Sequence, residues 1–86
     1  MVDERAEISV QLNKVFREVF DDDSIEIFDE MTAKDIPEWD SLMHIILVVA
    51  VEKEFKIRLN AAEVGQLKNV GGMLDLIAQR RARGTA

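Results

Sequence analysis

The sequence contains no cysteine among its 86 residues. It therefore offers neither a disulfide framework nor a thiolate metal site, and thiol chemistry would require a group supplied from outside the chain. Its longest uncharged run, Ser41 to Val51, is also far shorter than the roughly 20 residues that span a bilayer. The charged residues at positions 3–5 do not fit a signal peptide. We expect a cytoplasmic protein without a membrane span.

A chain of this length is expected to form one domain, residues 1–86, and a domain this small buries only about 60% of the surface of its unfolded chain. A deep active-site cavity is therefore not expected. The formal net charge of −6 disfavours nucleic acid and anionic membranes as partners and favours basic patches on other proteins. Nine carboxylates and only one lysine lie between residues 21 and 40, so the acidity is concentrated in one segment.

Apolar spacing and capping residues predict a small all-α bundle of three longer helices and one short helix. The predicted helices span residues 3–20, 41–55, 61–67 and 70–82. Asp40 is a suitable N-cap for the second helix, and Asn69 for the last. Asn60 with Glu63 resembles a capping box before the short helix. Inward stripes are predicted at Ile8, Leu12, Val15, Phe16, Val19 and Phe20 in the first helix and at Val70, Leu74 and Ile77 in the last.

Residues 21–40 have no helical period, and the single proline, Pro37, favours extended backbone at Ile36. The segment nevertheless holds many large apolar side chains, namely Ile25, Ile27, Phe28, Met31, Ile36 and Trp39. A disordered linker would not contain them, so we expect an ordered loop held to the core, with room for one short helical turn. Trp39 is expected to fix this loop beneath the start of the second helix.

The helix over 41–55 is apolar on nearly every side, so periodicity alone does not determine which side faces the core. A first set of residues, expected to face inward, consists of Leu42, Leu47, Val51 and Phe55. A second set, expected on a different face, consists of Met43, Ile46 and Val49. Either the rest of the chain covers this second face or it is an interaction surface.

Ser41 is the candidate functional residue, because a hydroxyl that follows an aspartate at a helix start suits covalent attachment. His44 lies three residues later, but a Ser–His catalytic pair also needs an orienting carboxylate and an oxyanion hole in a sheltered site. We therefore expect a non-enzymatic protein in which His44 lies on the surface. The acidic run from Asp21 lacks the glycine and the final glutamate of a calcium loop, so no metal site is expected.

The motif Asp40-Ser41-Leu42 at the start of the second of four helices, in an acidic chain with a long first loop, resembles that of acyl carrier proteins and the related peptidyl carrier domains. The resemblance covers about residues 5–80 and includes the Glu52–Phe55 helix end, the connector over 57–59 and the capped last helix. Trp39 before the motif, after a proline-containing loop, is similar to small stand-alone carriers of specialised pathways.

This resemblance implies a cofactor and a set of partners. Ser41 would bear 4′-phosphopantetheine, donated by coenzyme A through a phosphopantetheinyl transferase that uses magnesium. Asp40 would help the transferase, and Leu42 would complete the motif. The arm would carry an acyl intermediate as a thioester between an acyl-loading ligase or transferase and downstream enzymes of fatty-acid, polyketide or other specialised biosynthesis. A monomer is the simplest state for such a carrier.

The sequence departs from housekeeping carriers on the second helix. Those carriers bear acidic residues at the positions that match Met43 and Ile46, which are apolar here. We therefore hypothesise that dedicated partners bind a face of Met43, Ile46 and Val49, guided by Asp35 and Glu38 in the acidic loop. An aminoacyl or peptidyl carrier and an unmodified helical interaction module are the alternatives.

Overall fold

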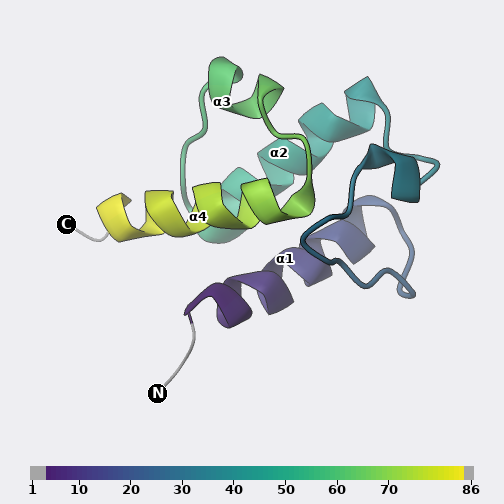
Figure 1. Ribbon diagram of the computed structural model, residues 1–86, viewed down its shortest axis with the longest axis horizontal. Coiled ribbons are helices and arrows are strands. Elements are labelled where there is room, and N and C mark those ends of the chain that lie inside the picture. The colour runs from purple at the N-terminus through teal and green to yellow at the C-terminus, as the bar shows by residue number, and fades with distance from the viewer. Residues whose placement is uncertain (1–3, 85–86) are drawn as a thin grey trace.

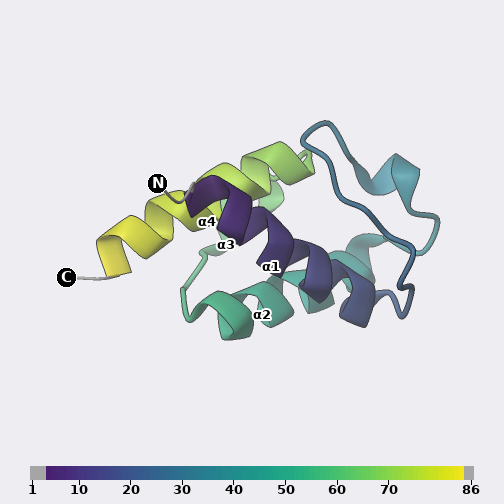
Figure 2. The same cartoon turned by 90° about the horizontal axis from the view of Figure 1, so that it is seen from below.

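The computed structural model describes residues 4–84, and all regular structure in this range is helical. The elements are α1 (Glu4–Val19), the 3-10 turn η1 (Ala33–Asp35), α2 (Ser41–Phe55), α3 (Ala61–Gly65) and α4 (Val70–Gly84). Figure 1 shows the long loop between α1 and α2 closing one end of the bundle, and Figure 2 shows α1 lying between α2 and α4, against both of which it packs. The predicted all-α bundle is confirmed, although α3 ends two residues earlier than expected. Residue 3, expected to begin the first helix, lies outside the described residues.

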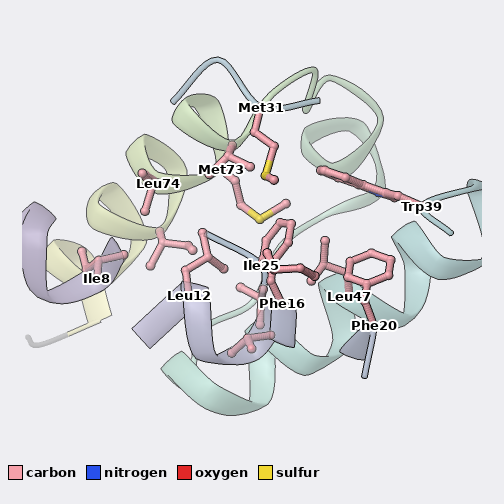
Figure 3. Close-up of a cluster of buried hydrophobic side chains, with 14 of the residues drawn as sticks. Ile8, Leu12, Phe16, Phe20, Ile25, Met31, Trp39, Leu47, Met73 and Leu74 are labelled. Atoms are coloured by element: carbon pink, nitrogen blue, oxygen red, sulfur yellow. The ribbon is translucent and has the colours of Figure 1, made fainter. Parts of the chain in front are cut away.

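The core lies where the three longer helices and the loop meet (Figure 3). Side chains with no exposed surface are Ile8, Leu12, Phe16, Leu47, Val51, Val70 and Ile77. Burial of one such side chain contributes about 1.5–3 kcal/mol, so this cluster supplies most of the stabilising free energy of a domain this small. The predicted inward stripes of α1 and α4 are confirmed, except that Val19 is only partly buried.

α2 turns Met43 rather than Leu42 toward the core. Leu42 is 66% exposed, so its predicted place in the inward stripe is wrong. Met43 is half-buried and packs against the core cluster. The helical period explains the difference, because Met43 lies four residues before Leu47 and shares its stripe, whereas Leu42 lies five residues before it on another side. The remaining members of the predicted inward set are buried.

Just after both α1 and α2, one residue lies in the left-handed region of backbone conformation. Asp21 has φ 51° and Lys56 has φ 55°. The N–H of the residue after Lys56 donates to the carbonyl of Glu52 at 3.1 Å, which is the long bond of a Schellman cap. At the end of α1, the equivalent bond runs from the N–H of Asp22 to the carbonyl of Arg17 at 3.0 Å. Glycine adopts this conformation freely, whereas other residues do so at a cost of about 1–2 kcal/mol.

Polar side chains of α1 hold the first half of the loop. The carbonyl of Ile25 accepts hydrogen bonds from Arg17 Nε at 2.8 Å and from Asn13 Nδ2 at 3.3 Å. Asn13 Oδ1 in turn accepts from the N–H of Ile27 at 2.7 Å. Ile25 is buried, as expected, but Phe28 is 46% exposed. Phe28 begins a turn that is closed by a hydrogen bond from the N–H of Met31 to the carbonyl of Phe28. The expectation that its side chain helps to hold the loop to the core is therefore wrong.

The second half of the loop is bonded to the start of α4. The first N–H groups of a helix have no partner within the helix. Here the N–H of Val70 donates to the carbonyl of Met31 at 2.9 Å, and the N–H of Gly71 donates to the carbonyl of Asp29 at 2.8 Å. The side chain of Asn69 accepts a hydrogen bond from the N–H of Gly72 at 2.8 Å, as its predicted capping role requires. The loop therefore serves as a cap for α4.

Arg5 links α1 to the same junction. Its guanidinium donates to Asp29 Oδ2 at 3.1 Å, to Asp75 Oδ1 at 3.2 Å and to the carbonyl of Gly71 at 3.4 Å. The hydrogen bond to Asp29 raises the pKa of Arg5 above its usual value. The loop, α1 and α4 thus meet at one polar junction beside the apolar core.

Substitution of Gly71 tests how closely the loop must approach α4. A Cβ on Gly71 would lie 3.0 Å from the carbonyl oxygen of Asp29 and 3.2 Å from its Cβ. Gly71→Ala is therefore expected to lower the free energy of unfolding by about 1–3 kcal/mol, measured by urea denaturation with circular dichroism. Gly65→Ala is the matched control, since nothing lies within 4 Å of the added Cβ. Equal stability of the two variants would show that the loop can move away without loss.

Candidate functional site

Ser41 is the first residue of α2, and its side chain is exposed. Asp40 precedes it as the N-cap, with extended backbone and with Oδ1 accepting from the N–H of Met43 at 2.9 Å. The carbonyl of Asp40 accepts the first helical hydrogen bond, from the N–H of His44 at 2.9 Å. The predicted capping role of Asp40 is therefore confirmed, and it places the Ser41 hydroxyl at the mouth of the helix.

The surroundings of Ser41 suit a covalently bound phosphate. The backbone N–H groups of Ser41 and Leu42 have no acceptor among the described residues. They lie at the positive end of the α2 dipole, where negative charge is stabilised by about 0.3–1 kcal/mol at an exposed site. A phosphodiester on the Ser41 oxygen would therefore lie beside two free donors and would need no buried space.

Trp39 connects this helix start to the core. Its side chain is only 8% exposed, and its ring meets that of Phe16 edge-on, with centroids 5.4 Å apart at 82°. The ring of Phe20 lies 6.1 Å away on the same side of the bundle. Trp39 therefore fixes the end of the loop against α1, as expected, and Ser41 lies two residues further along the chain.

His44 is not the surface residue that we expected. Its ring is half-buried and stacks on Trp39 at 15°, with centroids 6.0 Å apart. Trp39 Nε1 donates to His44 Nδ1 at 3.1 Å, so the proton of the neutral ring is on Nε2, which lies 3.3 Å from the carbonyl of Val64. Both ring nitrogens are thus engaged away from Ser41. This arrangement leaves no base for a Ser–His catalytic pair.

A groove lies beside Ser41, between the start of α2, the loop and α3. It is lined by Ala33, Trp39, Asp40, Ser41, His44, Val64, Gly65, Leu67 and Lys68. Its volume of about 420 Å³ is at the low end of the range for small-molecule clefts. His44 and Val64 both line this groove, so the hydrogen bond between them joins α2 to α3 at the groove.

The second apolar face of α2 is largely open to solvent. Ile46 and Val49 are 43% and 44% exposed, as the hypothesis of an interaction surface requires, whereas Met43 is half-buried. Leu42, which was expected to face inward, is 66% exposed, and Ile45, which belongs to neither predicted set, is 59% exposed. These positions have the spacing i, i+3, i+4 and i+7 of one helix face, a signal that was present but masked by the apolar residues around it. We call Leu42, Ile45, Ile46 and Val49 the α2 stripe.

The two acidic residues proposed to guide partners are both exposed, but they differ in role. Asp35 Oδ2 accepts from the N–H of Thr32 at 2.9 Å and completes a capping box around η1. It therefore also stabilises the loop. The side chain of Glu38 is exposed and makes no hydrogen bond or ion pair among residues 4–84. Within the same residues, no helix is long and apolar enough to cross a bilayer.

A small helical domain with a serine at the exposed start of its second helix has the architecture of a carrier protein. No family model matches the sequence. The chain is 30% identical over 70 residues to polyketide-8 synthase acyl carrier protein 2 of Streptomyces avermitilis, covering 81% of this chain and 80% of that one. The solution structure of holo acyl carrier protein from Geobacter metallireducens has a TM-score of 0.86 and 44% identity, covering 91% of this chain and 90% of that one. The protein belongs to the acyl carrier protein family, whose prosthetic group is covalently attached 4′-phosphopantetheine.

The bond between Trp39 and His44 can be tested with the single tryptophan of the chain as reporter. His44→Ala removes the acceptor for the indole N–H and leaves a buried donor unpaired, which costs about 1–3 kcal/mol of stability. We expect that loss in urea denaturation, together with a shift of tryptophan emission. Ile45→Ala is the control, because it truncates an exposed neighbour on the same helix. Unchanged emission in His44→Ala would contradict the assigned hydrogen bond.

Proposed function

We propose that Ser41 is the attachment site of 4′-phosphopantetheine and that the protein carries an acyl intermediate as a thioester on this arm. The observation that carries the proposal is the exposed Ser41 hydroxyl at the first position of α2, beside two N–H groups without acceptors. The absence of cysteine agrees with it, because the thiol of the arm supplies the reactive group that the chain lacks.

Attachment is a phosphoryl-type transfer at Ser41. The Ser41 oxygen forms a bond to the phosphorus that bears the pantetheine, while the pyrophosphate bond of coenzyme A breaks and the nucleotide leaves. The hydroxyl proton passes to a base of the phosphopantetheinyl transferase. Asp40 uses Oδ1 for the cap, and its Oδ2 has no partner among the described residues, so it is free to bind the magnesium of the transferase.

The cargo and partners follow from the family and from the α2 face. The relative from Streptomyces is a polyketide synthase carrier, which favours a polyketide or related acyl intermediate over an aminoacyl group. We propose that the cytoplasmic enzymes that load and use the arm bind Ile46 and Val49, with Met43 at the buried edge of this surface. Asp35 and Glu38 provide negative charge near the attachment site, which attracts basic enzyme surfaces.

The mass of the intact protein tests the attachment site. After incubation with coenzyme A, magnesium and a broad-specificity phosphopantetheinyl transferase, the wild type is expected to gain one phosphopantetheine and Ser41→Ala none. Asp40→Asn retains a good N-cap but loses the charge, so it is expected to keep its thermal midpoint and to react about ten-fold more slowly or worse. A wild-type protein that stays unmodified with its helices intact would favour the unmodified interaction module instead.

A further inference from the structure

The far end of α2 carries a basic cluster although the protein as a whole is acidic. Lys53, Lys56 and Arg58 are exposed, and none of them makes an ion pair or a side-chain hydrogen bond within residues 4–84. They line a groove of about 630 Å³ whose other walls are Val49, Glu52, Ile57 and Arg80. We call this the basic groove. It holds four cations and one carboxylate in a chain whose net charge is −6.

The nearby carboxylates have partners of their own. Glu52 accepts from the N–H of Leu59 at 2.9 Å, and Glu54 accepts from Gln11 Nε2 at 3.1 Å. Arg80 is paired with Glu63, so its charge is compensated. Lys53, Lys56 and Arg58 are therefore left facing solvent without a direct counter-charge.

Helix capping accounts for only part of this cluster. Lysine in the last turn of a helix interacts favourably with the helix dipole, which explains Lys53. Lys56, however, has φ 55°, a conformation that glycine adopts at lower cost. Arg58 lies beyond the end of α2 in the connector to α3. The local fold requires neither of these two cations.

The basic groove continues the α2 stripe. Val49 belongs to both surfaces, and Lys53 follows it by four residues on the same side of the helix. At the other end of the stripe lie the exposed acids Asp35, Glu38 and Asp40. With a rise of 1.5 Å per residue, Ser41 and Lys53 are about 18 Å apart along the helix axis. The exposed residues therefore change from acidic before α2, through apolar along it, to basic at its far end.

We propose that the basic groove is a second binding site for the enzyme that forms the thioester on the arm, and that carboxylates of this enzyme occupy it. This proposal rests on the proposed carrier function. The complementary enzyme surface has basic residues around its active-site entrance, an apolar centre, and acidic residues about 18 Å from the entrance. A carrier docked in the reverse direction would bring like charges together, so the two ends of α2 determine the orientation of docking.

Steady-state thioester formation on the holo protein tests this proposal. The enzyme used is the acyl-loading activity of the native host, purified by following thioester formation on the carrier by mass. Lys53→Glu is expected to lower kcat/KM about ten-fold through KM at low salt, and the difference from wild type is expected to shrink as salt increases. Lys14→Glu is the matched control, with the same charge change on an exposed residue of α1, and is expected to stay within about two-fold of wild type.

A second variant separates binding from stability. Lys56→Gly removes one cation at a position with φ 55°, so its thermal midpoint is expected to equal or exceed that of wild type while its KM rises. Equal kinetics for Lys53→Glu, Lys14→Glu and wild type would overturn the basic groove as a binding site. In both variants, conversion of Ser41 to the holo form is measured first. Failure of wild-type Ser41 to accept the arm would overturn the proposed function itself, so the two failures are distinguishable.

Discussion

The packing of Trp39 against Phe16 is the interaction on which the functional end of the molecule depends. Ser41 lies on an exposed helix start, where nothing covers it. Its position is therefore set by the residues just before it, and among residues 38–40 only Trp39 is buried. Because Trp39 also donates to His44, and His44 reaches Val64, one aromatic side chain connects the loop, α2 and α3. The proposed attachment site, which must be open to solvent, is thus held in place by the buried residues that precede it and lie behind it.

The long loop is held by backbone partners rather than by an element of its own. Ordering each residue costs about 1–2 kcal/mol in conformational entropy, so a loop of this length needs many compensating contacts. Asn13 and Arg17 satisfy its first backbone groups, and the start of α4 uses two of its carbonyls. The same bonds cap α4, whose first turn contains two glycines and would otherwise be weak. Loop and helix therefore stabilise each other, although they are distant in the sequence.

The roles of residues that bond to near neighbours in the chain were predictable from the sequence, whereas the roles of residues with distant partners were not. Asp40, Asn60 and Asn69 were identified as caps because a cap bonds to residues two or three positions away. His44 was misplaced because its partner, the carbonyl of Val64, lies 20 residues further along the chain. The rotation of α2 was misjudged at Leu42 because apolar residues on nearly every side of the helix mask the periodic signal of any one face. Only the packed core shows which side of it is covered.

The exposed stripe of α2 is suited to brief contacts. A carrier must release each enzyme after transfer, and small interfaces are typical of transient complexes. Four apolar side chains offer little area, so affinity from burial alone stays low. Charged groups around such a patch act mainly on the rate and orientation of encounter, without greatly prolonging the complex. An uncharged stripe between groups of opposite sign therefore allows a carrier to be recognised in one direction and still be released quickly. In this protein the distribution of charge along α2 says more about its partners than the net charge does.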